Sequence, residues 1–174
     1  SIATRLARDG ASVIVHYASN RARAEAVIKA IRDAGGEAEA VGADLSKAEG
    51  VTALIDSLNG VFGGKFEGRL DILVNNASAI DDALIMPGGF WERPVALVDI
   101  LDIGLRSSYV ASFHAAPLMI ETGGGLIAFT SSFGSVCYMH GPAYGAQKAG
   151  VDKFAADMGV DLKDHDVATI AIWM

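Results

Sequence analysis

The sequence predicts an α/β fold in which a doubly wound parallel sheet carries helices on both faces. Apolar, β-branched runs alternate with amphipathic stretches along the chain, at the spacing of strand, crossover helix and strand. The runs at 70–76 and 126–131 are almost wholly apolar, which is typical of strands covered on both faces. The 174 residues are 51% hydrophobic, a size and composition that suit a single domain over residues 1–174.

The first half of the chain is expected to contain a helix over 1–9, a strand over 12–17, a helix over 20–34, a strand over 37–44 and a helix over 46–62. Gly10 follows the first helix and Gly35-Gly36 follows the second, where glycine commonly ends a helix. Ser46 supplies a side-chain oxygen suited to capping the third helix.

The second half is expected to contain a strand over 70–76, a loop over 79–90, a helix over 94–120, a strand over 126–131, a helix over 142–162 and a strand over 167–174. Pro87-Gly88-Gly89 marks the loop, and Gly123-Gly124-Gly125 ends the first of these helices. Gly104 lies inside that helix.

Composition argues against several classes of function. A net charge of −7 predicts no broad basic face, which argues against a nucleic-acid partner. One cysteine, Cys137, allows no internal disulfide and fits a reducing, cytoplasmic compartment. Four scattered histidines give no metal-ligand spacing, and no apolar run reaches the ~20 residues of a membrane span.

Polar residues follow each expected strand, and the carboxyl ends of parallel strands share one ligand-binding edge of a sheet. Each residue alone is equally well explained as a helix cap or a turn former. Their occurrence together at one edge indicates a site. They are Ser19, Asn20, Arg21, Asp44, Asn75, Asn76, Ser131 and Ser132.

Tyr144 and Lys148 stand four residues apart on an expected helix, so their side chains share one face. Reduction of a carbonyl requires a proton for the developing alkoxide, and a tyrosine hydroxyl can deliver it. Tyrosine has an unperturbed pKa of ~10, and a lysine cation one turn away favours the phenolate. Ser131, thirteen residues before Tyr144, can orient the carbonyl. The hydride itself must come from a nicotinamide cofactor.

Three stretches carry a family resemblance: LDILVNNAS (70–78), GLIAFTSSFGS (125–135) and PAYGAQKAGVDKFAADM (142–158). They resemble the short-chain dehydrogenase/reductase family, whose fold is Rossmann-like, and the resemblance covers essentially the whole chain. The stretches 89–94 and 104–119 further resemble the subgroup of dehydrogenase/reductase family member 1.

The resemblance implies a role for each residue of the site. Tyr144 would be the general acid/base, and Lys148 would bind the nicotinamide ribose and tune Tyr144. Ser131 would orient the carbonyl, with Ser132 second because its spacing is one residue short. Contacts to the cofactor would come from Asn75, Asn76 and the Ala77 backbone, and at the adenine from Asp44 and Leu45.

The cofactor is expected to be NADP(H) rather than NAD(H). The stretch HYASNRAR (16–23) lacks the acid that would bind a free ribose 2′-hydroxyl. Ser19, Asn20 and Arg21 offer donors and a cation for a 2′-phosphate. Alternatively, Arg21 and Arg23 are merely solvated residues in the first turn of a helix.

The chain departs from the family pattern in two ways. The glycine-rich phosphate loop, the central first strand and the last strand of the family fold are absent, so we interpret the chain as an internal piece of a longer protein. Gly104 stands where the family commonly has an asparagine whose main-chain carbonyl holds a water near the lysine. Glycine keeps that carbonyl, at a cost of ~1 kcal/mol in helix propensity, so a proton relay is expected to remain possible.

The favoured function is an NADP(H)-dependent oxidoreductase that acts on a small carbonyl compound or a secondary alcohol. A truncated, non-catalytic scaffold that holds no cofactor is the alternative. An epimerase of the extended branch would need a large C-terminal domain that this chain lacks. Phe90 and Trp91 are expected to pack their loop against the sheet, although they could border a substrate, as could His140.

The full-length protein is expected to be a homodimer or homotetramer. In the family, the two helices expected over 94–120 and 142–162 pair across a two-fold axis. Small residues occur on the apolar faces of both: Ala111, Ala115, Ala116, Gly150, Ala155 and Ala156.

Overall fold

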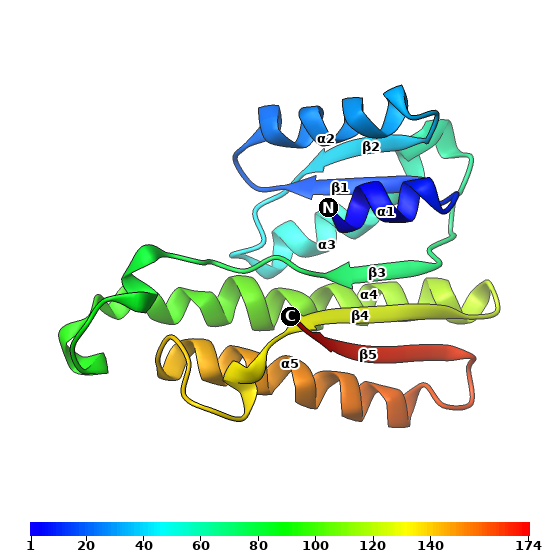
Figure 1. The fold of residues 1–174 in the computed structure, drawn as a ribbon. Coiled ribbons are helices and arrows are strands. Elements are labelled where there is room, and N and C mark those ends of the chain that lie inside the picture. Colours follow the sequence, from blue (N-terminus) through cyan, green and yellow to red (C-terminus); the bar gives the residue numbers. More distant parts are fainter.

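The computed structural model describes the backbone of residues 1–174 and every side chain except that of residue 59. Its strands form two parallel sheets (Figure 1). One pairs β1 (Val13–Tyr17) with β2 (Ala38–Gly42), and the other has the order β3 (Ile72–Asn75), β4 (Gly125–Ser131), β5 (Val167–Trp173). The predicted α/β class and parallel strands are therefore confirmed.

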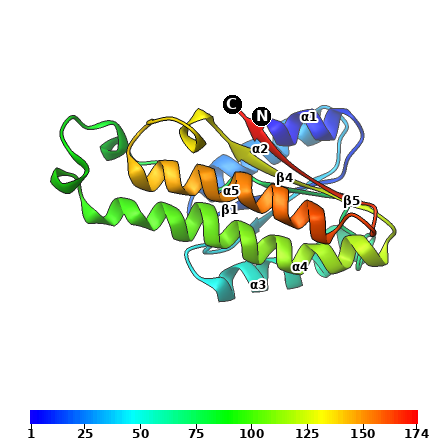
Figure 2. The same ribbon diagram turned by 90° about the horizontal axis from the view of Figure 1, so that it is seen from below.

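The helices lie on both faces of the strands (Figure 2). One face carries α1 (Ile2–Arg8) and α2 (Arg21–Asp33). The other face carries α3 (Ala48–Ser57), α4 (Ser107–Glu121) and α5 (Pro142–Asp161). The doubly wound arrangement follows from the strand–helix alternation, because each crossover helix returns the chain to begin another parallel strand.

Three apolar clusters form the core, and the smallest of them surrounds Leu84, Ile100 and Tyr144. The first packs α1 and α2 against β1 and β2, with Ala7, Val13, Ile28, Ile31 and Ala38 buried. The second packs α4 and α5 against β4 and β5, around residues that include Ala115, Met119, Ile127, Phe129 and Val151. A hydrogen bond of 3.1 Å between Thr52 Oγ1 on α3 and His114 Nε2 on α4 links the two halves.

The sheet is split between β1 and β3. Within the described part of the chain, β1 pairs with β2 alone and β3 pairs with β4 alone. This is the position at which the family resemblance implies a further central strand. The backbone groups on the two facing edges consequently lack a ladder partner from this chain.

The helix predicted over 46–62 is shorter than expected. Ser46 does not cap it, because both its backbone N–H and its hydroxyl donate to Asp44 Oδ1, at 3.0 and 2.6 Å. The helix α3 therefore begins after Lys47. It ends at Ser57 and passes into a 3₁₀ segment, Leu58–Gly64, in which Phe62 has a φ of +52°.

The predicted helix over 94–120 consists of three pieces. A 3₁₀ turn (Val95–Asp99) and a π-helical turn (Asp102–Arg106) precede α4. Gly104 lies in the π turn, where its low helix propensity makes the irregularity inexpensive. The loop before these turns extends beyond the ends of the strands (Figure 1).

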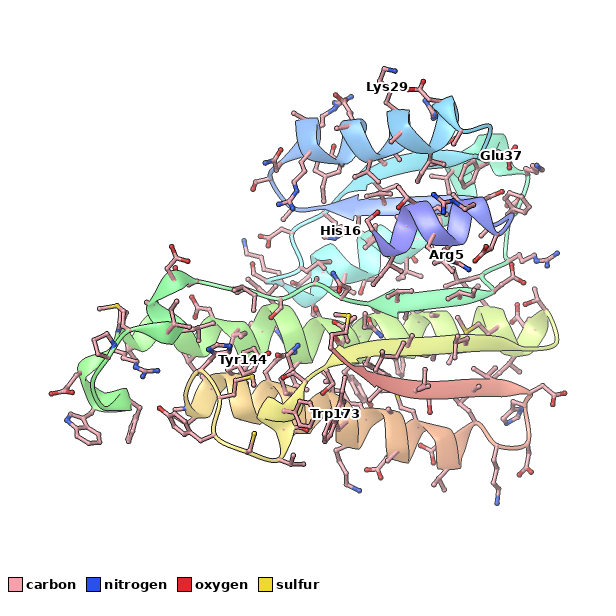
Figure 3. All side chains as sticks on the ribbon, in the orientation of Figure 1. Arg5, His16, Lys29, Glu37, Tyr144 and Trp173 are labelled. Atoms are coloured by element: carbon pink, nitrogen blue, oxygen red, sulfur yellow. The ribbon has the colours of Figure 1, made fainter. Side chains whose placement is uncertain are left out.

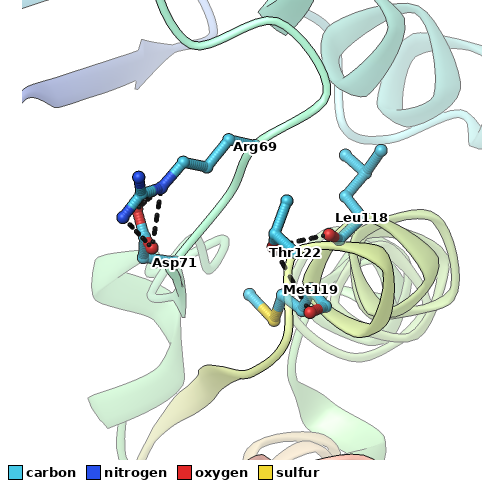
Figure 4. Close-up of polar contacts among 5 residues, drawn as sticks. All are labelled: Arg69, Asp71, Leu118, Met119 and Thr122. Atoms are coloured by element: carbon cyan, nitrogen blue, oxygen red, sulfur yellow. Dashed lines mark hydrogen bonds and ion pairs between the residues drawn. The ribbon is translucent and has the colours of Figure 1, made fainter.

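At the amino ends of the strands, away from this loop, local polar contacts hold the three-stranded sheet (Figure 4). The Arg69 guanidinium pairs with the Asp71 carboxylate at 3.0–3.1 Å just before β3. At the end of α4, Thr122 Oγ1 donates to the carbonyls of Leu118 at 2.8 Å and Met119 at 3.3 Å. These contacts lie at the amino ends of β3 and β4, away from the carboxyl ends where the polar residues gather.

Candidate active site

Tyr144, Lys148 and Ser132 come together beyond the carboxyl ends of β3–β5, and Figure 3 labels Tyr144 there. The Tyr144 hydroxyl lies 2.9 Å from Ser132 Oγ. Lys148 Nζ lies 5.4 Å from the centroid of the Tyr144 ring. All three residues are buried, with exposed fractions of 8%, 6% and 4% for Tyr144, Lys148 and Ser132. The Tyr144 phenol, the Lys148 ammonium and the Ser132 hydroxyl therefore lie together in one buried site.

Gly141 precedes the helix that carries Tyr144, and Gly134 leaves room for the Tyr144 ring. The helix α5 starts with Pro142 at its first position, after Gly141 with a φ of +95°. A Cβ atom at Gly134 would lie only 2.6 Å from Tyr144 Cε1, so the ring can occupy its place only over a glycine. Sequence reasoning missed Gly134, because a glycine in a Ser/Gly-rich loop looks the same as an ordinary turn former.

Lys148 is held by backbone and is electrostatically perturbed. Its Nζ donates to the Thr130 carbonyl at 3.1 Å, which leaves two of its three N–H bonds uncommitted to that contact. Burial lowers the pKa of Lys148 below its ordinary value, and the Asp152 carboxylate partly opposes that shift. Asp152 in turn accepts a hydrogen bond of 3.0 Å from Trp173 Nε1 at the end of β5.

The two serines contact different groups. Ser131 was expected to face the substrate, but its hydroxyl donates to the backbone carbonyl of Lys148 at 3.4 Å. Ser132 is the residue that contacts Tyr144, and it also accepts from Gly134 N at 3.1 Å. The spacing of thirteen residues before Tyr144 selects Ser131 by its position in the sequence alone. Successive residues at the end of a strand point to opposite faces, so the hydroxyls of Ser131 and Ser132 have different surroundings.

The residues expected to hold the cofactor lie along the carboxyl edge, several of them already engaged locally. Asn75 Nδ2 donates to Ser112 Oγ at 3.1 Å, which ties β3 to α4, and Asn76 is exposed immediately after the strand. Ala77 and Leu45 are half-buried. The hydrogen bonds from Ser46 lower the pKa of the exposed Asp44 carboxyl.

The end of β1 presents exposed residues to solvent. Asn20 Oδ1 caps α2 by accepting from Arg23 N at 2.9 Å, so its oxygen has a structural role. The Arg21 guanidinium pairs with Glu25 at 2.7 Å, and both side chains are more than half exposed. Hydrogen bonding to Glu25 raises the pKa of Arg21. Ser19 is exposed beside them.

The expected relay at Gly104 is altered. Its carbonyl accepts from Gln147 Nε2 at 3.1 Å and from Ser108 Oγ at 3.0 Å. Two side-chain donors of this chain thus contact the oxygen that was expected to hold a water near Lys148. Sequence reasoning gave Gln147 no role, since nothing local indicates a contact with a residue 43 positions away.

A pocket of about 270 Å³ opens over Tyr144 and is lined also by Ile80, Asp81, Asp82, Leu84, Ile85 and His140. The His140 ring meets the Tyr144 ring edge to face, with centroids 5.0 Å apart. An adjoining pocket is lined by Phe90 and Arg93 among others. Phe90 and Trp91 are 63% and 76% exposed, so the expectation that they pack against the sheet is wrong.

The described residues contain no group of three His, Cys, Asp or Glu side chains placed to hold a metal ion. In the same part of the chain, every helix is too short or too polar to cross a bilayer.

Comparisons with known proteins identify the family to which this chain belongs. Residues 1–173 match the sequence profile of a family described as short chain dehydrogenase. Dehydrogenase/reductase SDR family member 1 of Homo sapiens is 35% identical in an alignment of 178 positions that covers 99% of this chain and 54% of that protein. The 3-oxoacyl-(acyl-carrier-protein) reductase FabG of Staphylococcus aureus is 31% identical, covering 99% of this chain and 67% of the relative. The chain thus spans about half the length of the first of these relatives.

Two solved structures are similar in fold. A metagenomic short-chain oxidoreductase in complex with NADP superposes with a TM-score of 0.85 at 29% identity, over 98% of this chain and 73% of that one. A 7α-hydroxysteroid dehydrogenase complexed with NADH and 7-oxo glycochenodeoxycholic acid gives 0.84 at 28% identity, over 99% and 64%. The profile match, the sequence relatives and the shared fold agree: this chain belongs to the short-chain dehydrogenase family.

Proposed function

We propose that this chain carries the reacting side chains of an NADP(H)-dependent oxidoreductase that reduces a carbonyl compound or oxidises a secondary alcohol. One observation carries the proposal: the Tyr144 hydroxyl meets Ser132 Oγ at 2.9 Å beside a buried Lys148 and opens on a pocket. These are the groups that a carbonyl oxygen needs as it gains negative charge.

The residues divide the proton chemistry among them. The nicotinamide supplies or accepts the hydride when it is bound. In the reductive direction, Ser132 donates a hydrogen bond to the carbonyl oxygen, and Tyr144 transfers its hydroxyl proton to that oxygen. The Lys148 cation favours the phenolate that remains. In the oxidative direction, the phenolate of Tyr144 takes the proton back from the alcohol.

The donor set fits a nicotinamide dinucleotide. Two N–H bonds of Lys148 remain available for ribose hydroxyls, and we assign further cofactor contacts to Asn75, Asn76, Ala77, Asp44 and Leu45. The preference for NADP(H) rests on the end of β1, where the chain reads Tyr-Ala-Ser-Asn-Arg without an acid. Arg21 can turn toward a 2′-phosphate because its pair with Glu25 is solvent-exposed and therefore weak.

The function is tested with Tyr144→Phe in the full-length protein. The ring and its packing stay, so NADPH binding should persist while turnover of a carbonyl panel falls by at least about 10²-fold. Retained turnover would refute the assignment. The cofactor preference is tested separately with Arg21→Ala, which should weaken NADPH binding about tenfold and leave NADH binding unchanged. Arg23→Ala serves as the matched control.

A second candidate is a scaffold that binds no cofactor, and it is favoured by the local engagement of Asn20, Arg21 and Asn75, whose polar groups already have partners within the chain. NADPH should raise the melting temperature of the full-length enzyme if our first proposal holds. No rise for the full-length protein, together with no turnover, would favour the scaffold.

We also propose a cytoplasmic homodimer or homotetramer acting on a small molecule. Of the small residues expected at the contact face, Ala111, Ala115 and Ala155 are buried within this chain, whereas Ala116 and Gly150 are half-buried and Ala156 is exposed. The exposed aromatic residues of α4, Tyr109 and Phe113, are the better candidates, with exposed fractions of 50% and 64%. Sedimentation of the full-length Phe113→Glu variant would show whether the oligomer depends on that face.

A further inference from the structure

The half-buried Arg93 side chain carries a positive charge that no carboxylate of the described residues compensates. Its Nη1 donates to the carbonyls of Leu84 at 3.0 Å and His140 at 3.5 Å, and its Nη2 donates to Gly88 O at 3.3 Å. Its Nε is buried and has no acceptor within the same part of the chain. The three carbonyls fix the position of the guanidinium, but as neutral groups they leave its charge unpaired.

The unpaired guanidinium has the donors and the charge that suit a carboxylate. A charge that is partly removed from water is costly unless an opposite charge or enough hydrogen-bond partners replace the water. A guanidinium has five N–H bonds, and the three carbonyl contacts leave that of Nε and one of Nη2. This edge matches the two oxygens of a carboxylate, which arginine binds through two parallel hydrogen bonds.

Arg93 lines a pocket of about 200 Å³ whose other side chains are mostly apolar. Phe90 and Val95 contribute to it and are 63% and 88% exposed, so apolar surface there awaits a ligand of the same character. This pocket shares Leu84 and His140 with the pocket over Tyr144. A molecule whose carbonyl group lies at Tyr144 can therefore extend past these two residues to Arg93.

The charges along the two pockets determine which way such a molecule lies. Asp81 and Asp82 line the pocket over Tyr144, and both are exposed to water. Their negative charges oppose a carboxylate at the Tyr144 end, whereas Arg93 attracts one at the other end. An amine at the Tyr144 end would gain less, because exposed carboxylates are already solvated and bind cations weakly.

We propose that the joined pockets bind an oxo acid, with its carboxylate on Arg93, its apolar segment between the pockets and its carbonyl oxygen at Tyr144. This substrate class rests on the proposed function. The carbonyl carbon gains the hydride of the reduced nicotinamide, and the carbonyl oxygen gains the Tyr144 proton, so a hydroxy acid is formed. The carboxylate stays unchanged, and Arg93 is a residue that determines specificity.

Paired substrates separate the charge of Arg93 from its effect on pocket shape. The full-length enzyme is assayed with NADPH on isomers of oxooctanoate and on the methyl ester of each. The wild type should give a kcat/KM about tenfold higher for the acid than for the ester. Arg93→Gln keeps amide donors but removes the charge, so this ratio should fall to about one. Arg69→Gln, at the amino ends of the strands, is the matched control and should keep the wild-type ratio.

The ratio is informative even if Arg93→Gln lowers activity in general, because both members of a pair then lose equally. Equal use of acid and ester by the wild type, or an unchanged ratio in Arg93→Gln, would overturn the proposal. Preference for an amino ketone over the ester and the acid would assign recognition to Asp81 and Asp82 and would overturn it too.

A binding measurement tests the site without turnover. Octanoate should raise the melting temperature of the full-length wild type, with NADPH present, more than octanamide does, and Arg93→Gln should lose the difference. No preference for octanoate in the wild type overturns the carboxylate site. The failure of the proposed function looks different, since a wild type without turnover or an active Tyr144→Phe variant refutes the reaction while octanoate still decides the site.

Discussion

Ser132 Oγ lies 2.9 Å from the Tyr144 hydroxyl, whereas Ser131, at the spacing that the sequence favours, turns its hydroxyl to the backbone of Lys148. The pleat at the end of β4 separates the two side chains. Ser132 therefore lies beside the Tyr144 hydroxyl, and Ser131 lies against the backbone of α5.

Replacement of each serine in turn should separate these roles. Ser132→Ala should lower kcat/KM by about 10²-fold, since it removes a donor aimed at the developing negative charge. Ser131→Ala should leave kcat/KM near the wild-type value, because its hydroxyl makes only a long contact of 3.4 Å with Lys148 O. Steady-state kinetics on the full-length enzyme decide the matter, and the opposite ranking would restore Ser131 to the site.

Gly134→Ala should displace the tyrosine ring. The added methyl group would sit 2.6 Å from Tyr144 Cε1, so the ring must shift, at a cost of about 1–3 kcal/mol in the free energy of unfolding. Turnover should fall with it. Gly60→Ala is the control, because a Cβ there meets nothing within 4 Å. Urea denaturation and kinetics measure both effects, and a neutral Gly134→Ala would contradict the close contact.

Lys148→Met should abolish turnover without lowering stability at neutral pH. Burial lowers the pKa of Lys148, so the unfolded chain binds this proton more tightly than the folded one. Wild-type stability therefore gains from this group as pH rises toward the ordinary value of 10.5, where the folded lysine loses its proton first. The difference in unfolding free energy, variant minus wild type, should shrink between neutral pH and about pH 10. A constant or widening difference would show that the buried cation carries no penalty.

Arg93 should control the shape of the substrate pocket. Its Nη1 donates to the carbonyls of Leu84 at 3.0 Å and His140 at 3.5 Å, and its Nη2 donates to Gly88 O at 3.3 Å. These bonds join the loop before α4 to the loop that carries His140, whose φ is +58°. Arg93→Leu should raise KM for the carbonyl substrate about five- to tenfold, with a smaller change in kcat. Arg69→Leu, at the far edge of the sheet, should change neither, and equal effects of the two would argue against a local role.

Much of the fold can be predicted because the strongest signals in this sequence are local. The apolar run at 126–131 predicts β4 to within one residue, and Pro142 after Gly141 predicts the start of α5. The Tyr144–Lys148 pair follows from helical periodicity alone. These features depend only on neighbours along the chain, so the sequence displays them directly.

The missed features depend on which partner a side chain selects in three dimensions, whether that partner is near or far along the chain. Ser46 could have capped a helix, but Asp44 takes both its donors. The position of Gln147 depends on the room at Gly104, and that of the Tyr144 ring on Gly134. Counting residues cannot show which side chain fills a space that another residue leaves.

The central position of β4 has a thermodynamic consequence. It pairs with β3 on one side and β5 on the other, and its residues Ile127 and Phe129 lie in the apolar cluster beside α4 and α5. Its amide hydrogens should therefore exchange with solvent slowly, at the global unfolding limit. Because Ser132 follows this strand directly, the proposed reacting groups are anchored to the slowest-opening part of the molecule.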